Sequence, residues 1–407
     1  MSENTNSALH RRGFLQAGAT AAAALSMAPV SQAAPEEAAS KVLPRRRLGK
    51  TGVDVTILNQ GTWRSPDSLD RLLRMGYANG IRYIDTAKSY GSEPGVAKFF
   101  EAMPAGTRKE YFLVTKDSPR SPRELATMLD QRLAALKTDY IDLFFIHALG
   151  DHHSLDDAIG IVKGQELKEA MEAIKKSGKA RFIGFSTHHQ TRPQIMEAAA
   201  EAGIVDAIMV AYVPWLDKDA PLNRALDACH KRGIGLISMK QVAGNGEGIL
   251  REVPKHVPSL AEKGLSPYQG LLHAIWTDER ISSCCVSMRN TDQLRENTHA
   301  ARVFEPLKQA EMEQLHKAIL AAGPSFCANC DGSCSRAAGT DARLGELARL
   351  YTYHEQYGFR GEARELYAAL PDKDRDWKGA DLDAARHACP NRLDFASLLP
   401  EVDRKLA

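Results

Sequence analysis

The sequence predicts an α/β protein, built as a (β/α)8 TIM barrel with a C-terminal helical extension. Between residues 46 and 300, short apolar runs alternate with helical patterns at nearly even spacing. Eight such strand–helix pairs fit a closed barrel better than an open sheet. The run Leu143-Phe144-Phe145-Ile146 is apolar at every position, as expected of a strand that is buried on both faces.

The predicted elements follow one another in a regular order. A hairpin over residues 46–55 turns at residues 50–52 and precedes the first strand. The predicted strands cover residues 56–60, 82–85, 111–116, 140–147, 180–186, 205–211, 233–239 and 282–286. The predicted helices cover residues 68–79, 165–177, 191–202, 219–232 and 267–278, and Ser121-Pro122 starts another after the third strand. These elements define a barrel over residues 45–321 and leave residues 322–407 as the extension.

The first 34 residues are predicted to be an export signal rather than part of the fold. Arg11-Arg12 precedes residues 13–35, which carry no charge, are rich in Ala and Gly, and make a poor membrane span. The segment resembles a twin-arginine signal, the bacterial route that exports folded proteins. It therefore predicts a periplasmic protein that uses the twin-arginine machinery and keeps no membrane span after processing. The alternative is an alanine-rich disordered tail with a chance arginine pair.

Composition excludes some classes of function. The 53 basic and 51 acidic residues are mixed along the chain, so no nucleic-acid surface is expected. Seven cysteines are few for 407 residues, which argues against a disulfide scaffold. Of these, Cys229, Cys284 and Cys285 are predicted to be core residues, and the other four lie beyond residue 325.

Reactive side chains are predicted at the ends of successive strands. Asp85 ends the second strand and Tyr90 follows it, while Lys116 and His147 end the third and fourth strands. In a parallel barrel these ends meet at one mouth. A lysine placed against a phenol lowers the pKa of that phenol, so Tyr90 is a candidate general acid. Asp85 would balance the charge of Lys116, and His147 would orient a carbonyl oxygen.

Several motifs occur in the same order as in one known family. They are Arg-Leu-Gly-Lys-Thr-Gly at 47–52, Gly-Thr-Trp at 61–63, Asp-Thr-Ala-Lys-Ser-Tyr-Gly at 85–91, Val-Thr-Lys at 114–116, Asp-Tyr-Ile-Asp-Leu at 139–143, Ile-Gly-Phe-Ser at 183–186 and Asp-Gln-Leu-Arg-Glu-Asn at 292–297. Residues 45–300 resemble the aldo/keto reductases. The resemblance implies a monomeric barrel that uses NADPH without a metal, with Tyr90 as the acid, Lys116 and Asp85 as its tuning pair, and His147 as the carbonyl orienter.

The same resemblance implies a set of coenzyme-binding positions. They are Trp63, Asp85, Ser186, Thr187, Met209, Met239, Lys240, Ser287, Arg289, Gln293, Glu296 and Asn297. Several differ from the residues that are usual in the family. Thr187 stands where the family usually has an asparagine, Met209 where it has a glutamine, and Met239-Lys240 where it has an aromatic residue. The basic residues that could bind a 2′-phosphate are reduced to Arg289, Arg295 and Lys240.

Two histidine pairs and one tryptophan follow predicted strands. Residues 152–153 and 188–189 are His-His, and with His147 they offer imidazoles to a transition metal. Adjacent side chains on an extended segment diverge, so at most one of each pair can point inward. The alternative is that they are solvated or substrate-facing loop residues. Trp215 is either an apolar wall for substrate or a packing residue.

The extension carries its own candidate site. Cys327, Cys330 and Cys334 have the spacing C-x2-C-x3-C, and Cys389 follows 55 residues later, with helical stretches over 341–358 and 362–370 between them. The alternatives are a 4Fe–4S cluster, a structural zinc, and a degenerate site with free or disulfide-paired thiols. The tyrosine-rich residues 351–358 and the Cys-Pro-Asn-Arg-Leu-Asp-Phe sequence at 389–395 resemble the extension of the iron–sulfur subgroup of aldo/keto reductases.

Two functions are therefore expected to compete. The first is reduction of a small carbonyl compound, or oxidation of an alcohol, by hydride transfer with NADPH. The second is an exported iron–sulfur electron-transfer or binding protein on a barrel whose nicotinamide site has degenerated. The presence of Asp85, Tyr90, Lys116 and His147 favours the first function. The small number of basic residues available for a 2′-phosphate favours the second.

Overall fold

The computed structural model describes residues 42–151, 153–240, 257–322, 325–327, 330–356 and 358–407. The predicted export signal and its arginine pair therefore lie outside the described residues. Contacts within the chain separate Met1–Ala39 from a compact unit, Ser40–Ala407, which holds both the barrel and the extension. No helix in the described ranges is long and apolar enough to cross a membrane.

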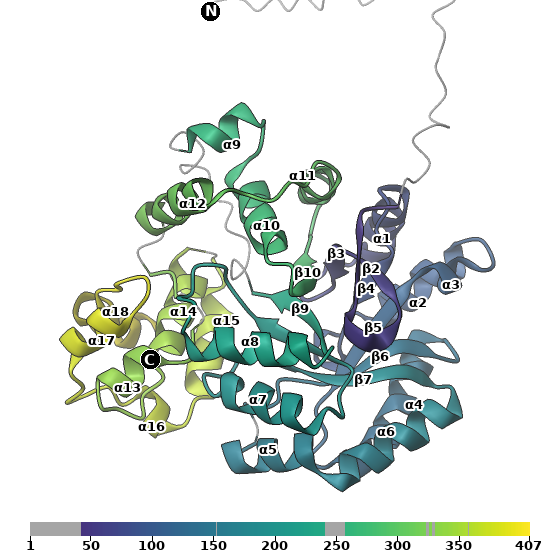
Figure 1. The fold of residues 1–407 in the computed structure, drawn as a ribbon, viewed down its shortest axis with the longest axis horizontal. Helices are drawn as coiled ribbons and strands as arrows, with labels where there is room; N and C mark the ends of the chain where they lie inside the picture. Colours follow the sequence, from purple (N-terminus) through teal and green to yellow (C-terminus); the bar gives the residue numbers. More distant parts are fainter. Residues whose placement is uncertain (1–41, 152, 241–256, 323–324, 328–329, 357) are drawn as a thin grey trace, which may run out of the picture. The chain divides into compact units, whose positions relative to one another are not determined.

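Within these residues, parallel strands close into a barrel in the order β10-β3-β4-β5-β6-β7-β8-β9, which confirms the predicted fold class (Figure 1). The strands are β3 (Leu58–Gly61), β4 (Tyr83–Asp85), β5 (Phe112–Asp117), β6 (Ile141–Ile146), β7 (Ala180–Thr187), β8 (Ala207–Ala211), β9 (Gly235–Met239) and β10 (Ile281–Ser287). The predicted hairpin is also present, with β1 (Arg45–Arg47) antiparallel to β2 (Asp54–Thr56). Its turn is anchored to the barrel, because the Lys50 N–H donates to the Gly233 carbonyl.

Helices alternate with the strands and surround the barrel. They are α1 (Leu69–Ala78), α2 (Glu93–Ala102), α3 (Thr107–Glu110), α4 (Leu125–Leu136), α5 (Leu155–Lys163), α6 (Gln165–Ser177), α7 (Arg192–Ala202), α8 (Pro221–Lys231), α9 (Pro258–Glu262), α10 (Pro267–Thr277), α11 (Thr291–Arg302) and α12 (Gln309–Ala322). The prediction for α6 is confirmed at both ends. The helix predicted from residue 219 begins instead at Pro221, because Ala220 is extended and the proline takes the first helical position.

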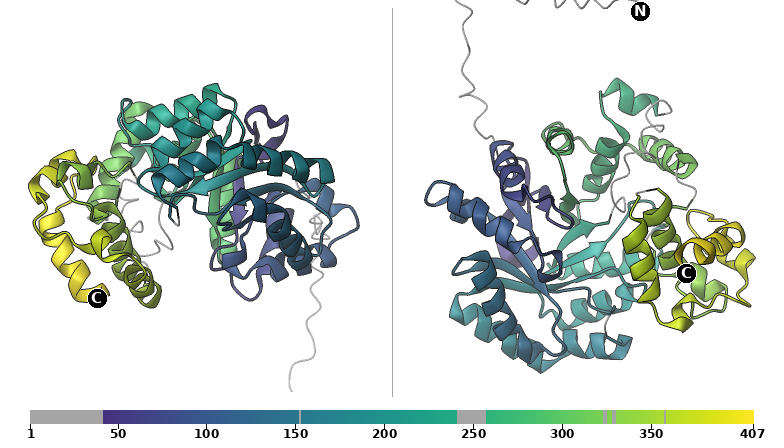
Figure 2. Two further views of the ribbon diagram at one scale, coloured as in Figure 1. Left: turned by 90° about the horizontal axis from the view of Figure 1, so that it is seen from below. Right: turned by 180° about the vertical axis from the view of Figure 1, so that it is seen from behind.

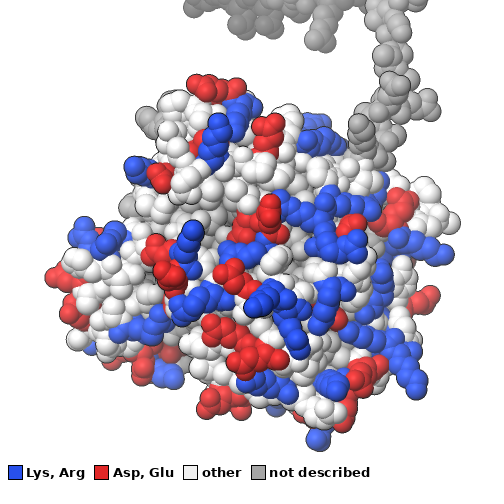
Figure 3. Space-filling view, in the orientation of Figure 1, with Lys and Arg blue, Asp and Glu red and all other residues white. Residues whose placement is uncertain are grey.

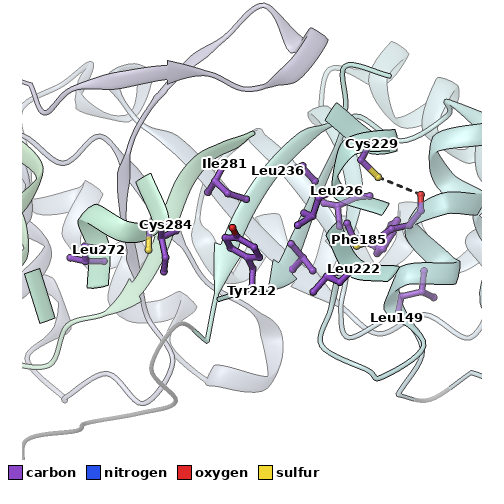
Figure 4. Packing of buried hydrophobic residues seen from close by; sticks show 14 of the residues in the cluster. Leu149, Phe185, Tyr212, Leu222, Leu226, Cys229, Leu236, Leu272, Ile281 and Cys284 are labelled. Carbon is purple, nitrogen blue, oxygen red and sulfur yellow. Dashed lines mark hydrogen bonds between the residues drawn. The ribbon is translucent and has the colours of Figure 1, made fainter. Parts of the chain in front are cut away.

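The core has two layers, one inside the barrel and one between strands and helices. Tyr83, Val114, Phe145 and Ile237 belong to the inner cluster. Figure 4 shows part of the outer cluster, where strand residues such as Phe185 face Leu222 and Leu226 of α8. Cys229 and Cys284 are fully buried in this layer, which confirms that they are core residues.

The extension is more helical than the sequence predicts. It contains α13 (Ser333–Ala337), α14 (Leu344–Glu355), α15 (Arg360–Ala368), α16 (Asp372–Arg375), α17 (Leu382–Ala388) and α18 (Phe395–Leu406), which group together in Figures 1 and 2. The sequence predicts only the helical stretches that correspond to α14 and α15. The pattern of α18 is interrupted by Pro400, yet its apolar side chains Phe395, Leu399, Val402 and Leu406 share one buried face.

The extension packs on the barrel through residues that follow β3 and β6. The ring of Trp63 lies 6.4 Å from that of Tyr353 and 6.3 Å from that of Phe359, measured between centroids. Arg64 forms an ion pair with Glu362. These contacts place α14 and the turn after it at the carboxyl ends of the strands, where a barrel carries its active site.

Acidic and basic side chains are interspersed on the face that Figure 3 shows. Exposed ion pairs such as Lys179–Asp130 and Arg123–Glu166 also bring opposite charges together on the surface of the protein. This mixed surface agrees with the nearly equal numbers of basic and acidic residues in the sequence.

Candidate active site

The four predicted catalytic residues come from three neighbouring strands. Asp85 is the last residue of β4, Lys116 lies near the end of β5, and His147 directly follows β6. Tyr90 ends η2 (Lys88–Tyr90), a short 3-10 turn after β4. Because Asp85 pairs in register with Val114, Lys116 is two residues further along the same face of β5. The parallel register therefore brings these side chains to one end of the barrel.

Asp85 and Lys116 form a buried ion pair. Each side chain is about 1 % exposed, and the Lys116 ammonium donates to Asp85 and, over 2.9 Å, to the Thr86 carbonyl. Burial acts to lower the pKa of Lys116, but Asp85 and Tyr90 outweigh it and raise that pKa. Lys116 therefore stays protonated as a fixed positive charge beneath the site.

Tyr90 and His147 form the open side of this group, since both are partly exposed. The Lys116 Nζ atom lies 5.1 Å from the centroid of the Tyr90 ring. The rings of Tyr90 and His147 meet edge to face with centroids 5.6 Å apart, and the Ser89 hydroxyl lies 3.4 Å from His147 Nδ1. A carbonyl oxygen that enters between the two rings can reach both polar groups.

The expected lowering of the pKa of Tyr90 is wrong for this structure. Burial raises the pKa of the phenol to about 12, and the opposing effect of Lys116 does not overcome it. Asp85 adds to the rise because it neutralises Lys116. Burial is thus the main reason for the raised pKa of the phenol, and Asp85 offsets part of the influence of Lys116.

Cys285 is a neighbour of this group that the sequence analysis placed in the core. It belongs to β10, which closes the barrel against β3, and it is partly exposed. Its thiol lies close enough to Asp85 for each group to affect the pKa of the other, and burial raises the pKa of the thiol. Only closure of the barrel between the first and last strands brings Cys285 to Asp85, so no local signal could have found it.

Part of the predicted coenzyme set forms a continuous arc along β7 to β10. Ser186 is the last residue but one of β7, and its hydroxyl accepts from the Ala148 N–H over 3.0 Å, so it keeps its own hydrogen for a ligand. Met209 is buried in β8, and Met239 and Lys240 lie at the end of β9. Lys240 adopts a left-handed backbone with φ of 56°, which is unusual for a residue other than glycine, and its ammonium lies 5.9 Å from the Trp63 ring.

The arc continues at the end of β10. Ser287 is the last residue of that strand, and the Arg289 N–H donates to the Gln293 side chain over 2.8 Å, which fixes the loop before α11. A helix that starts directly after such a strand favours phosphate at its N-terminus. Ser287 and Arg289 lie close to this end and offer a hydroxyl and a guanidinium to the phosphates of a dinucleotide, and the guanidinium also packs on the Phe359 ring at 4.8 Å from its centroid.

Other predicted coenzyme residues are used by the fold itself. The Thr187 hydroxyl donates to the Leu149 carbonyl over 2.8 Å and is fully buried. The Glu296 carboxylate accepts from Ser266, which caps α10, and Asn297 is buried on α11. The contacts of Thr187 and Glu296 therefore hold strands and helices together.

Only one histidine of the second pair turns toward the catalytic group. His188 Nε2 lies 3.0 Å from the Asp151 carboxylate, and His147 is near enough to affect the pKa of His188. His189 turns away and bonds Thr191 over 2.7 Å. His152 of the first pair lies outside the described residues. Trp215 stacks on His316 of α12 with centroids 4.8 Å apart, which favours the packing alternative.

The four cysteines of the extension do not assemble a metal site in the described part of the chain. No group of three or more His, Cys, Asp or Glu side chains there is placed to hold one metal ion. Cys330 and Cys389 nevertheless lie close enough to Cys334 to add to the rise that burial causes in the pKa of its thiol, and Cys330 has the same effect on Cys389. The site at Cys327, Cys330, Cys334 and Cys389 stays a prediction that this structure does not support.

The ion pair makes a prediction about stability. Lys116→Met leaves Asp85 buried without its cation and is expected to cost about 3–5 kcal/mol in urea denaturation. The double variant Asp85→Asn/Lys116→Met removes both charges, so it should cost less than Lys116→Met alone. Lys137→Met, which breaks the exposed pair with Glu101, serves as the control and should cost under about 1 kcal/mol. A double variant as unstable as the sum of its single variants would contradict the pairing.

Comparison with known proteins identifies the barrel. The sequence model described as "Aldo/keto reductase family" matches residues 57–320. Aldo-keto reductase family 1 member A1 of Mus musculus is 26 % identical over 294 residues, covering 66 % of this chain and 88 % of the relative. L-glyceraldehyde 3-phosphate reductase of Escherichia coli O157:H7 is 24 % identical over 324 residues, covering 66 % and 91 %.

Solved structures share the fold of the barrel. The holo form of an aldo-keto reductase from Bacillus halodurans superposes with a TM-score of 0.55 at 23 % identity, covering 68 % of this chain and 96 % of that one. A thermostable aldo-keto reductase in complex with the inhibitor epalrestat gives a TM-score of 0.54 at 25 % identity, covering 68 % and 100 %. The chain is an oxidoreductase-type barrel that belongs to the aldo/keto reductase family.

Proposed function

We propose that the protein reduces a small carbonyl compound, or oxidises the corresponding alcohol, by hydride transfer with NADPH. The observation that carries the proposal is the group of Tyr90, Lys116, Asp85 and His147 at one end of the barrel, with the phenol and the imidazole on its open side. A proton donor and a hydrogen-bonding ring around one position are what a carbonyl oxygen needs as it becomes an alkoxide.

Each residue has a separate part in this chemistry. Tyr90 donates its O–H proton to the carbonyl oxygen, and in the reverse direction its phenolate takes the proton back from the alcohol. Lys116 stabilises that phenolate, and Asp85 holds the ammonium in position through their ion pair. His147 presents its ring edge to the same oxygen and aligns it with Tyr90.

NADPH supplies the hydride to the carbonyl carbon when it is bound. Ser186 and Met209 would lie along its nicotinamide end, and Lys240, Ser287 and Arg289 would hold its phosphates, since these residues form the arc from β7 to β10. The sequence offers fewer basic residues for binding a 2′-phosphate than the family resemblance implies. Affinity for the coenzyme is therefore expected to depend strongly on Lys240 and Arg289.

Removal of the phenol hydroxyl tests the assignment. Tyr90→Phe is expected to lower kcat for NADPH-dependent aldehyde reduction by about 10²–10⁴-fold, because the proton donor is lost while the ring remains. Tyr77→Phe removes a hydroxyl that bonds Glu110 on the barrel surface and should leave kcat within a factor of two. Reductase activity that survives in Tyr90→Phe would refute the role of the phenol.

The raised pKa of Tyr90 predicts the pH profile. An acid whose pKa is raised to about 12 stays protonated as pH rises, so kcat/KM for reduction should show no loss from the phenol between pH 6 and 10. The measurement is a steady-state profile with one aldehyde at fixed NADPH. A descending limb near pH 8 that disappears in Tyr90→Phe would show instead that the phenol ionises far below 12.

We also propose that residues 1–34 direct export to the periplasm by the twin-arginine route, supported by Arg11-Arg12 and the uncharged segment after them. A reporter that requires export, fused behind residues 1–40, is expected to be exported in bacteria that have this machinery. Arg11→Lys/Arg12→Lys should retain it in the cytoplasm. Equal export of both fusions would reject the proposal.

A further inference from the structure

We propose that Phe359, which lies between α14 and α15 of the extension, is a positioning residue that holds the guanidinium of Arg289 for the 2′-phosphate of NADPH. The inference rests on the proposed function and deepens it, because it assigns the choice of coenzyme to a contact between the barrel and the extension. The match to the family model ends at residue 320, so Phe359 belongs to a segment that this model does not cover.

Two arginines of the barrel pack on the Phe359 ring. Arg64 follows β3, and its Cζ atom lies 4.2 Å from the ring centroid. Arg289 follows β10, and its Cζ atom lies 4.8 Å from the same centroid. The two loops are neighbours because β10 pairs with β3, with Ser287 opposite Gly61. One ring of the extension therefore joins the loops that follow the first and last strands of the barrel.

Other contacts fix this ring in place. Its centroid lies 6.3 Å from that of Trp63 and 6.3 Å from that of Tyr353, edge to face in both cases. The Phe359 N–H donates to the Tyr353 carbonyl over 2.9 Å, which fixes the backbone as well. Arg64 is held in turn by its ion pair with Glu362 in the first turn of α15. The ring is therefore a restrained surface on which a second guanidinium can pack.

The start of α11 leaves the recognition of a phosphate largely to side chains. The Asn290 side chain accepts hydrogen bonds from the N–H groups of Asp292 and Gln293. The Gln293 side chain accepts from the Arg289 N–H over 2.8 Å. These three backbone N–H groups are thus already bonded within the protein. The helix dipole still favours an anion here, but hydrogen bonds to it must come largely from side chains such as the Arg289 guanidinium.

A phosphate monoester is the anion that an arginine in this position suits best. At neutral pH a monoester carries nearly two negative charges and has three terminal oxygens, and a guanidinium can bond to two of them at once. The 2′-phosphate of NADPH is such a group, whereas each phosphate of the pyrophosphate bridge carries a single charge. NADH lacks the 2′-phosphate. The arrangement therefore predicts that the protein binds NADPH more tightly than NADH.

The aromatic ring restrains the guanidinium without competing for its hydrogen bonds. A cation over a ring is attracted by the π electrons, and this contact supplies no acceptor that would displace a phosphate oxygen. An arginine side chain has many rotamers, and ordering it at the moment of binding lowers affinity. Phe359 and Arg289 are both partly exposed, so the contact is not sealed inside the protein. Phe359 therefore raises the affinity for NADPH by ordering Arg289 beforehand.

The test compares NADPH with NADH in the full chain, because the two coenzymes differ only in the 2′-phosphate. The readout is the dissociation constant for NADH divided by that for NADPH, both measured by titration of nicotinamide fluorescence. We expect Phe359→Leu to lower this ratio about 3–10-fold, since Arg289 must then be ordered during binding. A general loss of packing weakens the binding of both coenzymes and leaves the ratio unchanged.

Phe304→Leu is the matched control. Phe304 is also a partly buried phenylalanine with an arginine on its ring, because the Arg46 Cζ atom lies 5.4 Å from its centroid. Arg46 donates to the carbonyl of Ile281, the first residue of β10, so this contact lies at the other end of the barrel from Arg289. The control variant should keep the wild-type ratio. Phe359→Tyr, which retains a ring, should keep it as well.

A double-mutant cycle shows whether Phe359 acts through Arg289. Arg289→Met is expected to lower the ratio about 10–100-fold, because a charge-assisted hydrogen bond to the 2′-phosphate is lost. Phe359→Leu should then cause no further loss when Arg289 is already replaced. An equal loss from Phe359→Leu in the presence and absence of Arg289 would overturn the inference.

A second variant tests the inference if thermal unfolding shows that Phe359→Leu does not fold. Arg64→Met/Glu362→Gln removes the ion pair that holds one of the two arginines on the ring, and it leaves the net charge unchanged. It should lower the ratio by about 2-fold, because the ring is then less restrained. An unchanged or increased ratio in this variant overturns the inference.

The outcomes separate this inference from the proposed function. An unchanged or increased ratio in Phe359→Leu, or a wild-type ratio close to one, overturns the inference, while aldehyde reduction and Tyr90→Phe still decide the catalytic proposal. A ratio that falls as expected in a protein that reduces no carbonyl compound supports the inference and contradicts the proposed function. A wild-type protein that binds neither coenzyme contradicts both.

Discussion

The ion pair between Asp85 and Lys116 is the interaction on which the rest of the site depends. Both groups are almost fully buried, where a single charge would be very costly, so each requires the other. The register of β4 with β5 places them side by side. The Thr62 hydroxyl donates to the Asp85 backbone carbonyl, and the Thr86 carbonyl accepts from the Lys116 ammonium. Because the pair is fixed by strand pairing, the positions of Tyr90 and His147 relative to it are fixed as well.

The pair also limits what Lys116 can do for the phenol. A lysine beside a tyrosine lowers the pKa of that tyrosine, but here burial of the phenol outweighs Lys116, and the Asp85 carboxylate offsets part of the effect of Lys116. Tyr90 is thus a weak acid that remains protonated over a wide pH range.

The sequence could predict the barrel and its strand-end residues because both follow from local patterns. Asp85, Lys116 and His147 end apolar runs, and in a parallel barrel all such ends meet. The acidity of Tyr90 could not be predicted, because it depends on burial depth, which no local pattern encodes. Cys285 reaches Asp85 only through closure of β10 on β3. Phe359 lies far along the chain, and only the packing of the extension on the barrel shows that it meets Arg289.

Two residues, one in the extension and one in the barrel, show where prediction from local sequence patterns fails. Pro400 interrupts the pattern of α18, although the helix continues through it and buries one face. Glu296 matches a family motif at the level of sequence, yet its carboxylate accepts a hydrogen bond from Ser266, the residue that caps α10. In both cases a tertiary contact, rather than the local residue type, decides whether the helix continues or what the side chain binds.

The most direct test of hydride transfer at this site is a reduction with NADPH deuterated at both C4 positions of the nicotinamide, followed by mass spectrometry of the alcohol. The account predicts one deuterium on the carbon that carried the carbonyl oxygen, and formation of this alcohol about 10²–10⁴-fold more slowly by Tyr90→Phe than by the wild-type protein. An alcohol without deuterium, or no alcohol at any NADPH concentration, would contradict it.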